Sequence, residues 1–319
     1  MRGARAHVLA GLLLAVTIET AAAAEVNYYP LPLGSGPHDV APAPDGTVWY
    51  SGQRKGLLGR LDPKTGKAEE IPLGPNAMPH GVIVGPDGAA WVTEGGQNAI
   101  ARVDPASKAV KLFPLPQEAP YANLNTMTFD KNGIGWFTGQ VGYHGRVTPQ
   151  SGKVEVWKTP RGFGTYGITT TPSGDIWYAS LAGDHIGRLD LASGAATVVE
   201  PPRKGVGPRR IWSDSKGILW VSLWNTGEVG RYDPATQSWK TWQLPNSKRG
   251  CYSVYVDDRD KVWLTDFQAN AIVRFDPATE SFDVFPSSKS GANVRQMLGR
   301  PGEAWGAESG NNRLVVVRD

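Results

Sequence analysis

Two histidines occupy equivalent places in the N-terminal half of the chain and are candidates for a general base or a metal ligand. His38 and His80 each follow a proline and lie eleven residues before a tryptophan, Trp49 and Trp91 respectively. Glu94 follows three residues after Trp91. A histidine beside a carboxylate has its tautomer fixed and its basicity raised, which suits proton abstraction. The spacing predicts that His80 and Glu94 form a catalytic pair, with His38 close to them.

The same two positions recur along the chain and carry many residues suited to ligand binding. Eleven residues before each repeated tryptophan stand His38, His80, Asn125, Tyr166, Arg209, Tyr252 and Val294. Three residues after it stand Gly52, Glu94, Gly139, Ser180, Leu223, Asp266 and Glu308. Trp224 and Phe267 lie beside the second set and would add an aromatic rim for a flat or cyclic ligand. The competing interpretation is that these side chains only line a wet channel.

The tryptophans that define these positions reveal the architecture. They lie 41 to 45 residues apart, at Trp49, Trp91, Trp136, Trp177, Trp220, Trp263 and Trp305. Each unit contains a short strand, a tight turn such as Pro86-Asp87-Gly88, the tryptophan strand and two further strands. Four short strands in about 42 residues are typical of a propeller blade. The sequence therefore predicts an all-β, seven-bladed β-propeller over residues 25–319, with almost no helix.

The two ends of the predicted ring complement each other. The seventh unit stops after its third strand, at residues 315–317, whereas residues 26–31 resemble the fourth strands of the other units. We expect this N-terminal strand to complete blade seven and close the ring, which removes exposed sheet edges. The repeated tryptophans are predicted to pack between blades. A matching arginine series is predicted to bind backbone carbonyls or acidic neighbours, and comprises Arg60, Arg102, Arg146, Arg188, Arg231 and Arg274.

The first 24 residues have the features of a signal peptide. Arg2 and Arg5 precede an apolar stretch at residues 8–18, and Ala22 and Ala24 form an Ala-x-Ala cleavage site before Glu25. We expect a periplasmic or secreted protein, with an uncleaved anchor as the alternative. No later segment has about 18 consecutive apolar residues, so the mature chain should have no membrane span.

Charge and cysteine content exclude several classes of function. The net charge is only +3, from 33 basic and 30 acidic residues, which argues against nucleic acid as a partner. Cys251 is the only cysteine and cannot form an intrachain disulfide; a small buried residue is favoured over a catalytic thiol. His144 and His185 lie eight residues after their tryptophans, on outer strands, and are expected to be structural. We expect a monomer that binds a small molecule at the central channel.

One blade matches the motif of a known family. The pattern Pro-His-Gly-Val, Pro-Asp-Gly, Trp-Val-Thr-Glu, Asn-x-Ile and Arg runs from Pro79 to Arg102. In this pattern, and over essentially the whole mature chain, the sequence resembles the streptogramin lyase (virginiamycin B lyase) family. The resemblance implies a seven-bladed propeller that opens a cyclic depsipeptide by β-elimination at its ester bond. It also implies a divalent metal, usually Mg²⁺.

The catalytic residues of that family do not transfer directly. The resemblance implies a histidine and a glutamate on the last blade, a histidine on the blade before it and a tyrosine on the first blade. The last blade has Glu308 but carries Val294 and Arg295 where the histidine is expected. The sixth blade has Tyr252 in place of its histidine, and the first blade has His38 in place of the tyrosine.

A rotated match around the ring works better. His38 on one blade would be followed by His80 with Glu94 on the next. The third blade would then have to supply the tyrosine; its channel position is Asn125, and Tyr121 lies just upstream as a substitute.

Three functions are therefore compatible with the sequence. In the first, a lyase uses His80 as base, Glu94 to orient it, and His38 or a bound metal to stabilise the oxyanion. The predicted ligand-binding residues are Tyr166, Arg209, Tyr252, Trp224, Asp266, Glu308, Asn125 and Tyr121. The second is a non-catalytic propeller that binds a ligand or protein. The third is a sugar-lactone hydrolase or quinone-dependent dehydrogenase, but no set of acidic channel ligands supports calcium-dependent lactonase chemistry.

Overall fold

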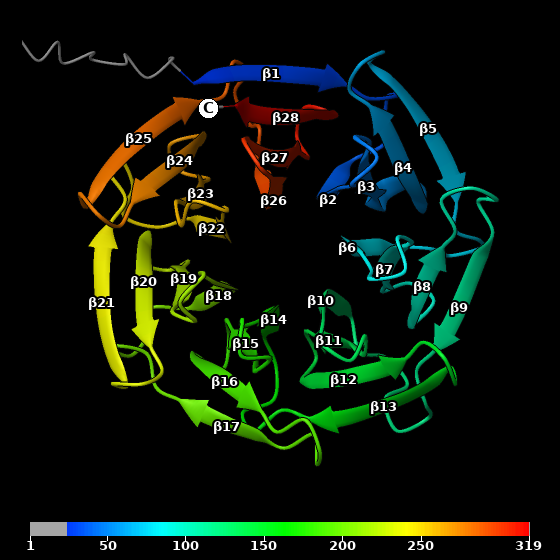
Figure 1. Cartoon of the computed structure of the whole chain (residues 1–319), viewed down its shortest axis with the longest axis horizontal. Helices are drawn as coiled ribbons and strands as arrows, with labels where there is room; N and C mark the ends of the chain where they lie inside the picture. The colour runs from blue at the N-terminus through cyan, green and yellow to red at the C-terminus, as the bar shows by residue number, and fades with distance from the viewer. Residues whose placement is uncertain (1–23, 319) are drawn as a thin grey trace, which may run out of the picture.

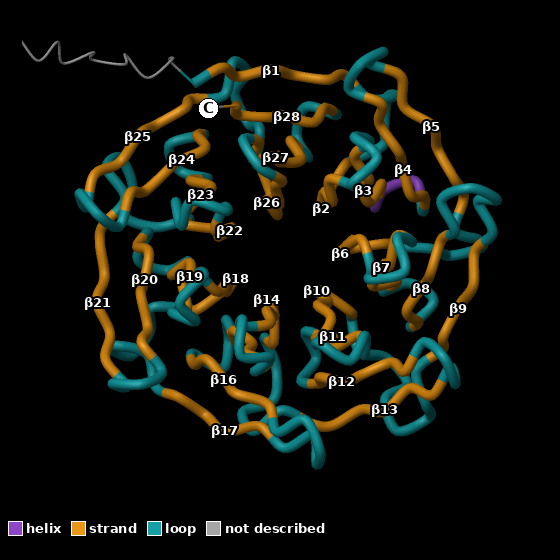
Figure 2. The backbone as a smooth tube through the Cα atoms, viewed as in Figure 1, coloured by secondary structure: helices purple, strands orange, loops and turns teal. Residues whose placement is uncertain are grey.

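A computed structural model describes residues 24–318 as a closed ring of seven antiparallel four-stranded sheets (Figure 1). The predicted all-β, seven-bladed propeller is thereby confirmed. The predicted signal peptide lies almost wholly outside the described residues. Within them, η1 (Gln53–Lys55) is the one helical segment (Figure 2), and no helix of the described part is long and apolar enough to span a membrane.

Each of the first six blades consists of four strands that are consecutive in the chain. Blades one to three are β2 (Pro37–Pro42), β3 (Val48–Gly52), β4 (Leu57–Asp62), β5 (Lys67–Pro72); β6 (Pro79–Val84), β7 (Ala90–Glu94), β8 (Ala99–Val103), β9 (Val110–Pro114); and β10 (Leu124–Phe129), β11 (Gly135–Gly139), β12 (Tyr143–Thr148), β13 (Lys153–Lys158). Blades four to six are β14 (Thr165–Thr170), β15 (Ile176–Ser180), β16 (His185–Leu189), β17 (Ala196–Val199); β18 (Pro208–Ser213), β19 (Leu219–Leu223), β20 (Glu228–Asp233), β21 (Ser238–Gln243); and β22 (Cys251–Val256), β23 (Val262–Asp266), β24 (Ala271–Asp276), β25 (Ser281–Pro286).

Blade seven joins the two ends of the chain, as the sequence predicts. Its inner strands are β26 (Val294–Arg300), β27 (Glu303–Glu308) and β28 (Arg313–Arg318), and β1 (Glu25–Pro30) is the outermost strand. β1 pairs with β28 in antiparallel register from Glu25↔Arg318 to Pro30↔Arg313. The pairing leaves no open blade in the ring.

The repeated tryptophans form the packing layer of the blades. All seven lie on the second strands and are at most 4% exposed. In six blades the arginine of the third strand is the register partner of the tryptophan, as in Trp49↔Arg60. Arg60 stacks on Trp49 at 5.0 Å and binds Asp45 and the carbonyl of Pro105. Both series therefore have the structural roles predicted for them.

A β-bulge interrupts the first hairpin of every blade at the same place. In blade two the register shifts between Pro79 and Val82, and all seven first hairpins show the equivalent shift. A bulge breaks the strict alternation of side chains and redirects those next to it. In blades one to six the bulge includes the residue eleven positions before the tryptophan, and in blade seven it falls one residue later, on Arg295 and Gln296. The strands that carry the bulges are those nearest the ring axis (Figure 1).

Hydroxyl groups hold the bulges in five of the seven blades. In blade two, Thr93 Oγ1 accepts the backbone N–H of Gly81 at 2.7 Å and donates to the carbonyl of Asn125 in blade three at 2.6 Å. The equivalent residues are Ser51, Thr138, Ser222 and Thr265, whereas blades four and seven carry Ala179 and Ala307. The serine or threonine two residues after the tryptophan thus positions the channel residues.

Candidate functional site

The bulges of the seven inner strands direct a group of polar and aromatic side chains towards one another at the ring axis. We call this group the channel cluster, and it comprises His38, Asp39, His80, Asn125, Thr126, Tyr166, Arg209, Arg210, Tyr252 and Arg295. Contacts within it cross the ring, from blade five to blades one and three. Except for Arg295, which is half-buried, its members are at most 9% exposed.

The two histidines lie against each other. Their ring centroids are 3.9 Å apart. Nδ1 of His38 is 2.7 Å from the Oδ1 of Asp39, and Nδ1 of His80 is 3.0 Å from the backbone carbonyl of Asn125. Because a carboxylate and a carbonyl only accept hydrogen bonds, both Nδ1 atoms donate, and each Nε2 keeps its lone pair. In His80 that lone pair faces the Asn125 amide nitrogen at 3.3 Å.

Burial and charge keep both rings neutral. Burial lowers the pKa of His38 well below 6.5, and the positive charges of Arg295, Arg210 and Arg209 lower it further. For His80, burial is again the main cause, followed by His38. Burial raises the pKa of Asp39. A buried neutral imidazole can accept a proton at neutral pH, and Asp39 would stabilise the imidazolium that results.

Three arginines enter the cluster from β18 and β26. Arg210 is 1% exposed, donates to Thr126 Oγ1 of blade three and lies 3.6 Å from the Asp39 carboxylate of blade one. Arg209 donates to the Tyr166 hydroxyl at 2.7 Å. Arg295 is 3.3 Å from the hydroxyl of Tyr252. The cluster therefore combines neutral bases with fixed positive charge.

The arginines change the acidity of Tyr252. Burial alone would raise its pKa, but Arg209, Arg210 and Arg295 together lower it to about 8. In contrast, burial and the neighbouring Tyr252 raise the pKa of Tyr166 to about 12. Tyr252 is thus the phenol of the cluster that can release a proton near physiological pH.

The predicted aromatic rim is present beside the arginines. Tyr252 and Phe267 stack at 4.6 Å between ring centroids, and Trp224 meets both of them edge-on. Trp224 and Phe267 also line a pocket of about 370 Å³ together with Arg249, Gly250, Gln268 and Asn293. Arg209 joins rim and cluster, because its guanidinium carbon lies 4.5 Å from the Trp224 ring and 3.9 Å from the Tyr252 ring.

The prediction that Glu94 lies opposite His80 and orients it is wrong. Glu94 Oε1 accepts the backbone N–H groups of Met78 and Gly96. The bulge is the reason, because it makes Pro79 rather than His80 the register partner of Glu94. Among the described residues, the carboxylate that contacts a histidine is that of Asp39, which lies at hydrogen-bond distance from His38.

The two other predicted carboxylates also hold loops. Asp266 accepts hydrogen bonds from Ser247 and from the backbone N–H of Ala269. Glu308 accepts hydrogen bonds from three side chains, Ser287, Arg313 and Asn311. These contacts tie the second strand of a blade to the loops around it, which places Asp266 and Glu308 among the loop-stabilising residues.

The remaining sequence candidates lie outside the cluster. Tyr121 is 56% exposed in the loop before β10, where no contact with the histidines is recorded among the described residues. His144 and His185 lie on third strands and bind the carbonyls of Gly194 and Gly183, as expected for structural histidines. Cys251 is fully buried, and burial raises the pKa of its thiol, consistent with a packing role.

The donor set does not fit the Mg²⁺ that the resemblance implies. His38, Asp39 and His80 each offer one ligand atom, all within 4.8 Å of one another. Mg²⁺ prefers six oxygen ligands, whereas this group supplies one carboxylate and two imidazoles. Two nitrogens and one oxygen suit a transition metal better. A dication would nevertheless meet the positive charges of Arg209, Arg210 and Arg295.

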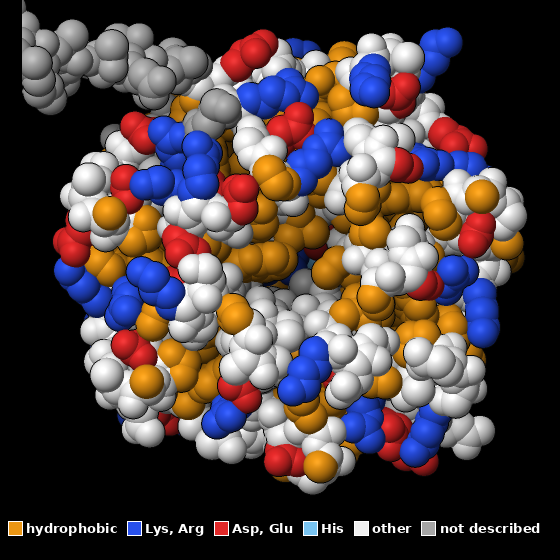
Figure 3. All heavy atoms as spheres, viewed as in Figure 1, with side chains coloured by type: hydrophobic (Ala, Val, Ile, Leu, Met, Phe, Trp, Pro, Cys, Tyr) orange, Lys and Arg blue, Asp and Glu red, His pale blue; other side chains and the backbone are white. Residues whose placement is uncertain are grey.

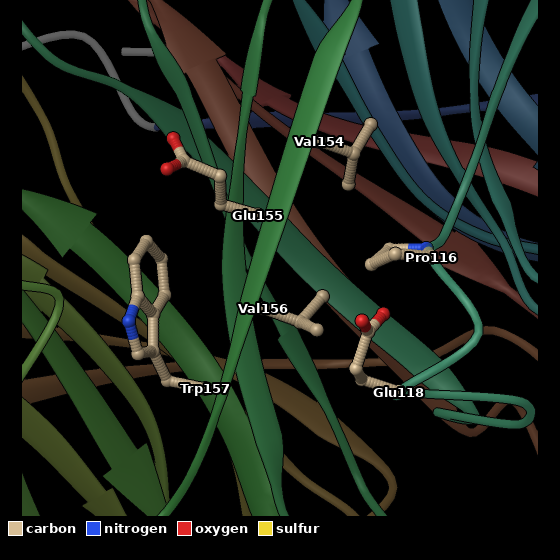
Figure 4. A pocket seen from close by; sticks show the side chains of 6 residues that line it. All are labelled: Pro116, Glu118, Val154, Glu155, Val156 and Trp157. Carbon is tan, nitrogen blue, oxygen red and sulfur yellow. The ribbon is translucent and has the colours of Figure 1, made fainter.

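Other pockets lie away from the axis and are lined by no residue of the channel cluster. One of about 350 Å³ lies beside the outer strand β13, where Val154 and Val156 point towards Pro116 and Glu118 (Figure 4). Glu155, on the opposite side of the strand, is paired with Arg146. On the face seen in Figure 3, charged side chains gather near the rim, whereas apolar and uncharged atoms surround the centre. The channel cluster is therefore the best candidate for a site.

Asp39, Thr126 and Arg210 are not among the site residues predicted from the sequence, and Arg295 has no predicted role in binding. All four stand ten residues before a repeated tryptophan, directly after the channel position that lies eleven residues before it. A signal was present in the two-residue runs His38-Asp39 and Arg209-Arg210, because adjacent charged residues are unusual in a buried strand. The bulge that brings both members of each run into the channel could not be read from the spacing.

Fold and site define a seven-bladed β-propeller with a cationic, histidine-containing cluster at its axis. A family model of the virginiamycin B lyase family matches residues 16–158 and 74–319. The chain belongs to this family. Among proteins with curated functions, none matches it in sequence.

Solved structures agree on the fold. A virginiamycin B lyase from Staphylococcus aureus is 22% identical over 93% of this chain and 100% of that chain, with a TM-score of 0.85. A streptogramin B lyase is 22% identical over 92% of this chain and 97% of its own, with a TM-score of 0.84. A catalytically inactive virginiamycin B lyase from S. aureus, crystallised with quinupristin, is 21% identical with a TM-score of 0.85 and covers 93% of this chain and 100% of that chain. At these identities the comparisons establish the architecture.

Proposed function

We propose that this protein is a lyase that eliminates a group bound through oxygen from the carbon β to a carbonyl. The observation that carries the proposal is the His38–Asp39 contact inside a cluster of arginines. His38 is neutral, is oriented through Nδ1 and has its Nε2 lone pair available. His80, with its Nε2 facing Asn125, lies against it as a neighbour in the same layer. We therefore assign the base to His38 instead of His80.

The proposed step needs no oxidant, reductant or water. Nε2 of His38 takes the proton on the carbon next to the carbonyl. The electron pair of that C–H bond forms a carbon–carbon double bond, and the C–O bond at the β carbon breaks. If the leaving group is an ester oxygen, it departs as a carboxylate. The arginines stabilise negative charge on the carbonyl oxygen as it develops, and Asp39 stabilises the imidazolium.

The test is incubation of purified protein with a cyclic depsipeptide and mass spectrometry of the product. Elimination opens the ring at unchanged mass, whereas hydrolysis adds one water. Quinupristin is a suitable first substrate because it accompanies an inactive variant of a family member. Absence of an elimination product across a panel of cyclic and linear ester substrates with an acidic α-hydrogen would refute the proposal.

A binding platform is the second candidate, and one surface feature favours it. Leu33, Met78, Tyr121 and Phe163 are 55% to 88% exposed, and each lies in the loop before an inner strand of blades one to four. Large exposed apolar side chains around one face are typical of interaction sites. A platform predicts no turnover, and loss of partner binding when Tyr121 and Phe163 are replaced by serine.

We also propose export to the periplasm or the medium. Ala22 and Ala24 satisfy the cleavage rule, so the mature chain should begin at Glu25, the first residue of β1. Cleavage there leaves the strand that closes blade seven intact. Mass spectrometry of exported protein that retains residues 1–24 would contradict this proposal.

A further inference from the structure

The arginines of the channel cluster lack matching negative charge. Within the described residues, Arg210 is the one member of Arg209, Arg210 and Arg295 that has an ion-pair partner, the Asp39 carboxylate at 3.6 Å. That carboxylate already accepts a hydrogen bond from His38. The neighbouring histidines are neutral and supply no negative charge. The cluster therefore has an excess of positive charge inside the protein.

Some of the donors of these arginines are unused. The Nε atoms of Arg209 and Arg210 are buried and have no hydrogen-bond partner among residues 24–318. A buried charged donor without a partner costs more free energy than almost any other polar defect. Buried donors without a partner are rare in folded proteins, and they indicate that a bound ligand supplies the hydrogen-bond acceptor. An acceptor that carries negative charge would satisfy them.

The surroundings of Arg209 select a particular kind of acceptor. Its guanidinium carbon lies 4.4 Å from the Tyr166 ring, 3.9 Å from the Tyr252 ring and 4.5 Å from the Trp224 ring. These three aromatic rings restrict the position of the guanidinium group, whose planar shape matches the planar geometry of a carboxylate. Trp224, which contacts Arg209, also lines the pocket of about 370 Å³ together with Phe267. A pocket of this size can hold a ring-sized organic body.

We propose that the channel cluster binds an organic carboxylate whose flat or cyclic body lies against Trp224 and Phe267. Arg209, Arg210 and Arg295 bind the carboxylate group. The assignment of this anion as substrate or product rests on the proposed lyase function, but the binding itself does not require turnover. If the ligand is a substrate, its own carboxylate occupies the arginines; if it is a product, the carboxylate is the released leaving group.

Isothermal titration calorimetry of the full-length mature protein with matched probes tests the proposal directly. Phenylacetate carries the predicted anion and ring, phenylacetamide is its neutral counterpart, and sulfate is an inorganic anion. We expect phenylacetate to bind at least about tenfold more tightly than phenylacetamide and than sulfate. Its affinity should also fall with increasing salt. Equal affinity for the acid and the amide, or absence of phenylacetate binding, overturns the proposal.

Variants of the most accessible arginine locate the site. Arg295→Gln should weaken phenylacetate binding about 10- to 100-fold, and Arg295→Lys should restore part of it by returning the charge. Arg188→Gln is the matched control, because Arg188 is an exposed outer arginine paired with Asp175. Unchanged binding in Arg295→Gln, or an equal loss in Arg188→Gln, overturns the assigned position. The wild-type comparison of acid with amide decides the question even if a variant does not fold.

Other results separate this proposal from the lyase function. Tight binding of Zn²⁺ that is lost in His38→Ala, together with no phenylacetate binding to the metal-free protein, would identify a metal site and overturn the anion site. Phenylacetate binding without turnover of any ester refutes the lyase and leaves the anion site in place. Turnover of neutral esters that phenylacetate does not inhibit refutes the anion site and leaves the lyase. To distinguish substrate from product, esters with and without a second carboxylate are compared for KM.

Discussion

The outer arginines and the channel arginines have opposite surroundings in the same ring. Each outer arginine has a carboxylate within ion-pair distance: Arg60, Arg102, Arg146, Arg188, Arg231 and Arg274 are paired with Asp45, Asp87, Glu155, Asp175, Asp233 and Asp283. Of the three channel arginines, only Arg210 has a carboxylate within ion-pair distance in the described part of the chain, namely Asp39.

The pattern of repetition follows the same division. The outer tryptophan and arginine recur because every pair of adjacent blades presents the same packing problem. The channel positions vary around the ring: eleven residues before the tryptophan, two blades carry His, two carry Tyr, and the others carry Asn, Arg or Val. They vary because the ring axis carries no packing requirement that all blades share. Scaffold residues are therefore recognised by repetition and candidate functional residues by departure from it.

The largest effect that could break this comparison is expected at His38. His38→Ala should lower the elimination rate by about 10²- to 10⁴-fold, the usual contribution of a general base, while the fold is retained. Because burial and the arginines hold the pKa of His38 well below 6.5, wild-type activity should fall only below that pH, as the base becomes protonated. Initial rates between pH 4.5 and 8 measure both effects. Full activity in His38→Ala would show that the proposed base does not take part in the elimination. As a control, Glu94→Gln should reduce thermal stability more than it reduces the elimination rate.

A scaffold tryptophan should show the reverse behaviour. Trp220 is 1% exposed, and its Nε1 donates to Asp214 at 3.1 Å. Trp220→Ala should lower the free energy of unfolding by about 3–5 kcal/mol through the cavity that it leaves. Urea denaturation measures the loss, with Leu33→Ala as an exposed control expected to change little. Phenylacetate binding at low temperature should survive in the folded fraction; its selective loss would mean that scaffold and site are coupled.

A pH titration of phenylacetate binding sharpens the contrast further. The pKa of Tyr252 is lowered to about 8, so its hydroxyl is protonated below that pH and becomes a phenolate above it. A phenolate beside the arginines repels an anionic ligand, and affinity should fall about tenfold as the pH rises through about 8. The charged and titratable groups that face Tyr252 are Arg209, Arg210, Arg295, Asp39 and Tyr166. In Tyr252→Phe the decrease should disappear; its persistence would assign the titration to another group.

The smallest effect is expected at an outer arginine. The Arg188–Asp175 pair, at 2.7 Å, is 55% and 37% exposed, so solvent screens it. Arg188→Gln should change the free energy of unfolding by less than about 1 kcal/mol and leave phenylacetate binding unchanged. Thermal unfolding and calorimetry on the same sample measure both quantities. A large loss of stability would show that the outer pairs contribute more than exposed ion pairs usually do.

The sequence by itself determined the scaffold. The tryptophan period, the turn residues and the apolar strand at residues 26–31 predict seven blades and the closure of the ring, and β1 paired with β28 confirms this. These features are local, because strand alternation and turn chemistry act over a few residues. The sequence also predicts that certain side chains lie at the channel, because equivalent positions of the repeat occupy equivalent places in each blade. These side chains are His38, His80, Tyr166, Arg209 and Tyr252.

Only the tertiary structure decided which of these residues touch. The β-bulge near the start of each inner strand shifts the register of the first hairpin. As a result, the Glu94 carboxylate accepts a hydrogen bond from its own loop, and Asp39 is the carboxylate that contacts a histidine. Ring closure then brings Arg210 of blade five within 3.6 Å of Asp39, although 171 positions separate them in the sequence. Contacts across the axis depend on the curvature of the whole ring and on one register shift per blade, and neither is encoded by the spacing within any single blade.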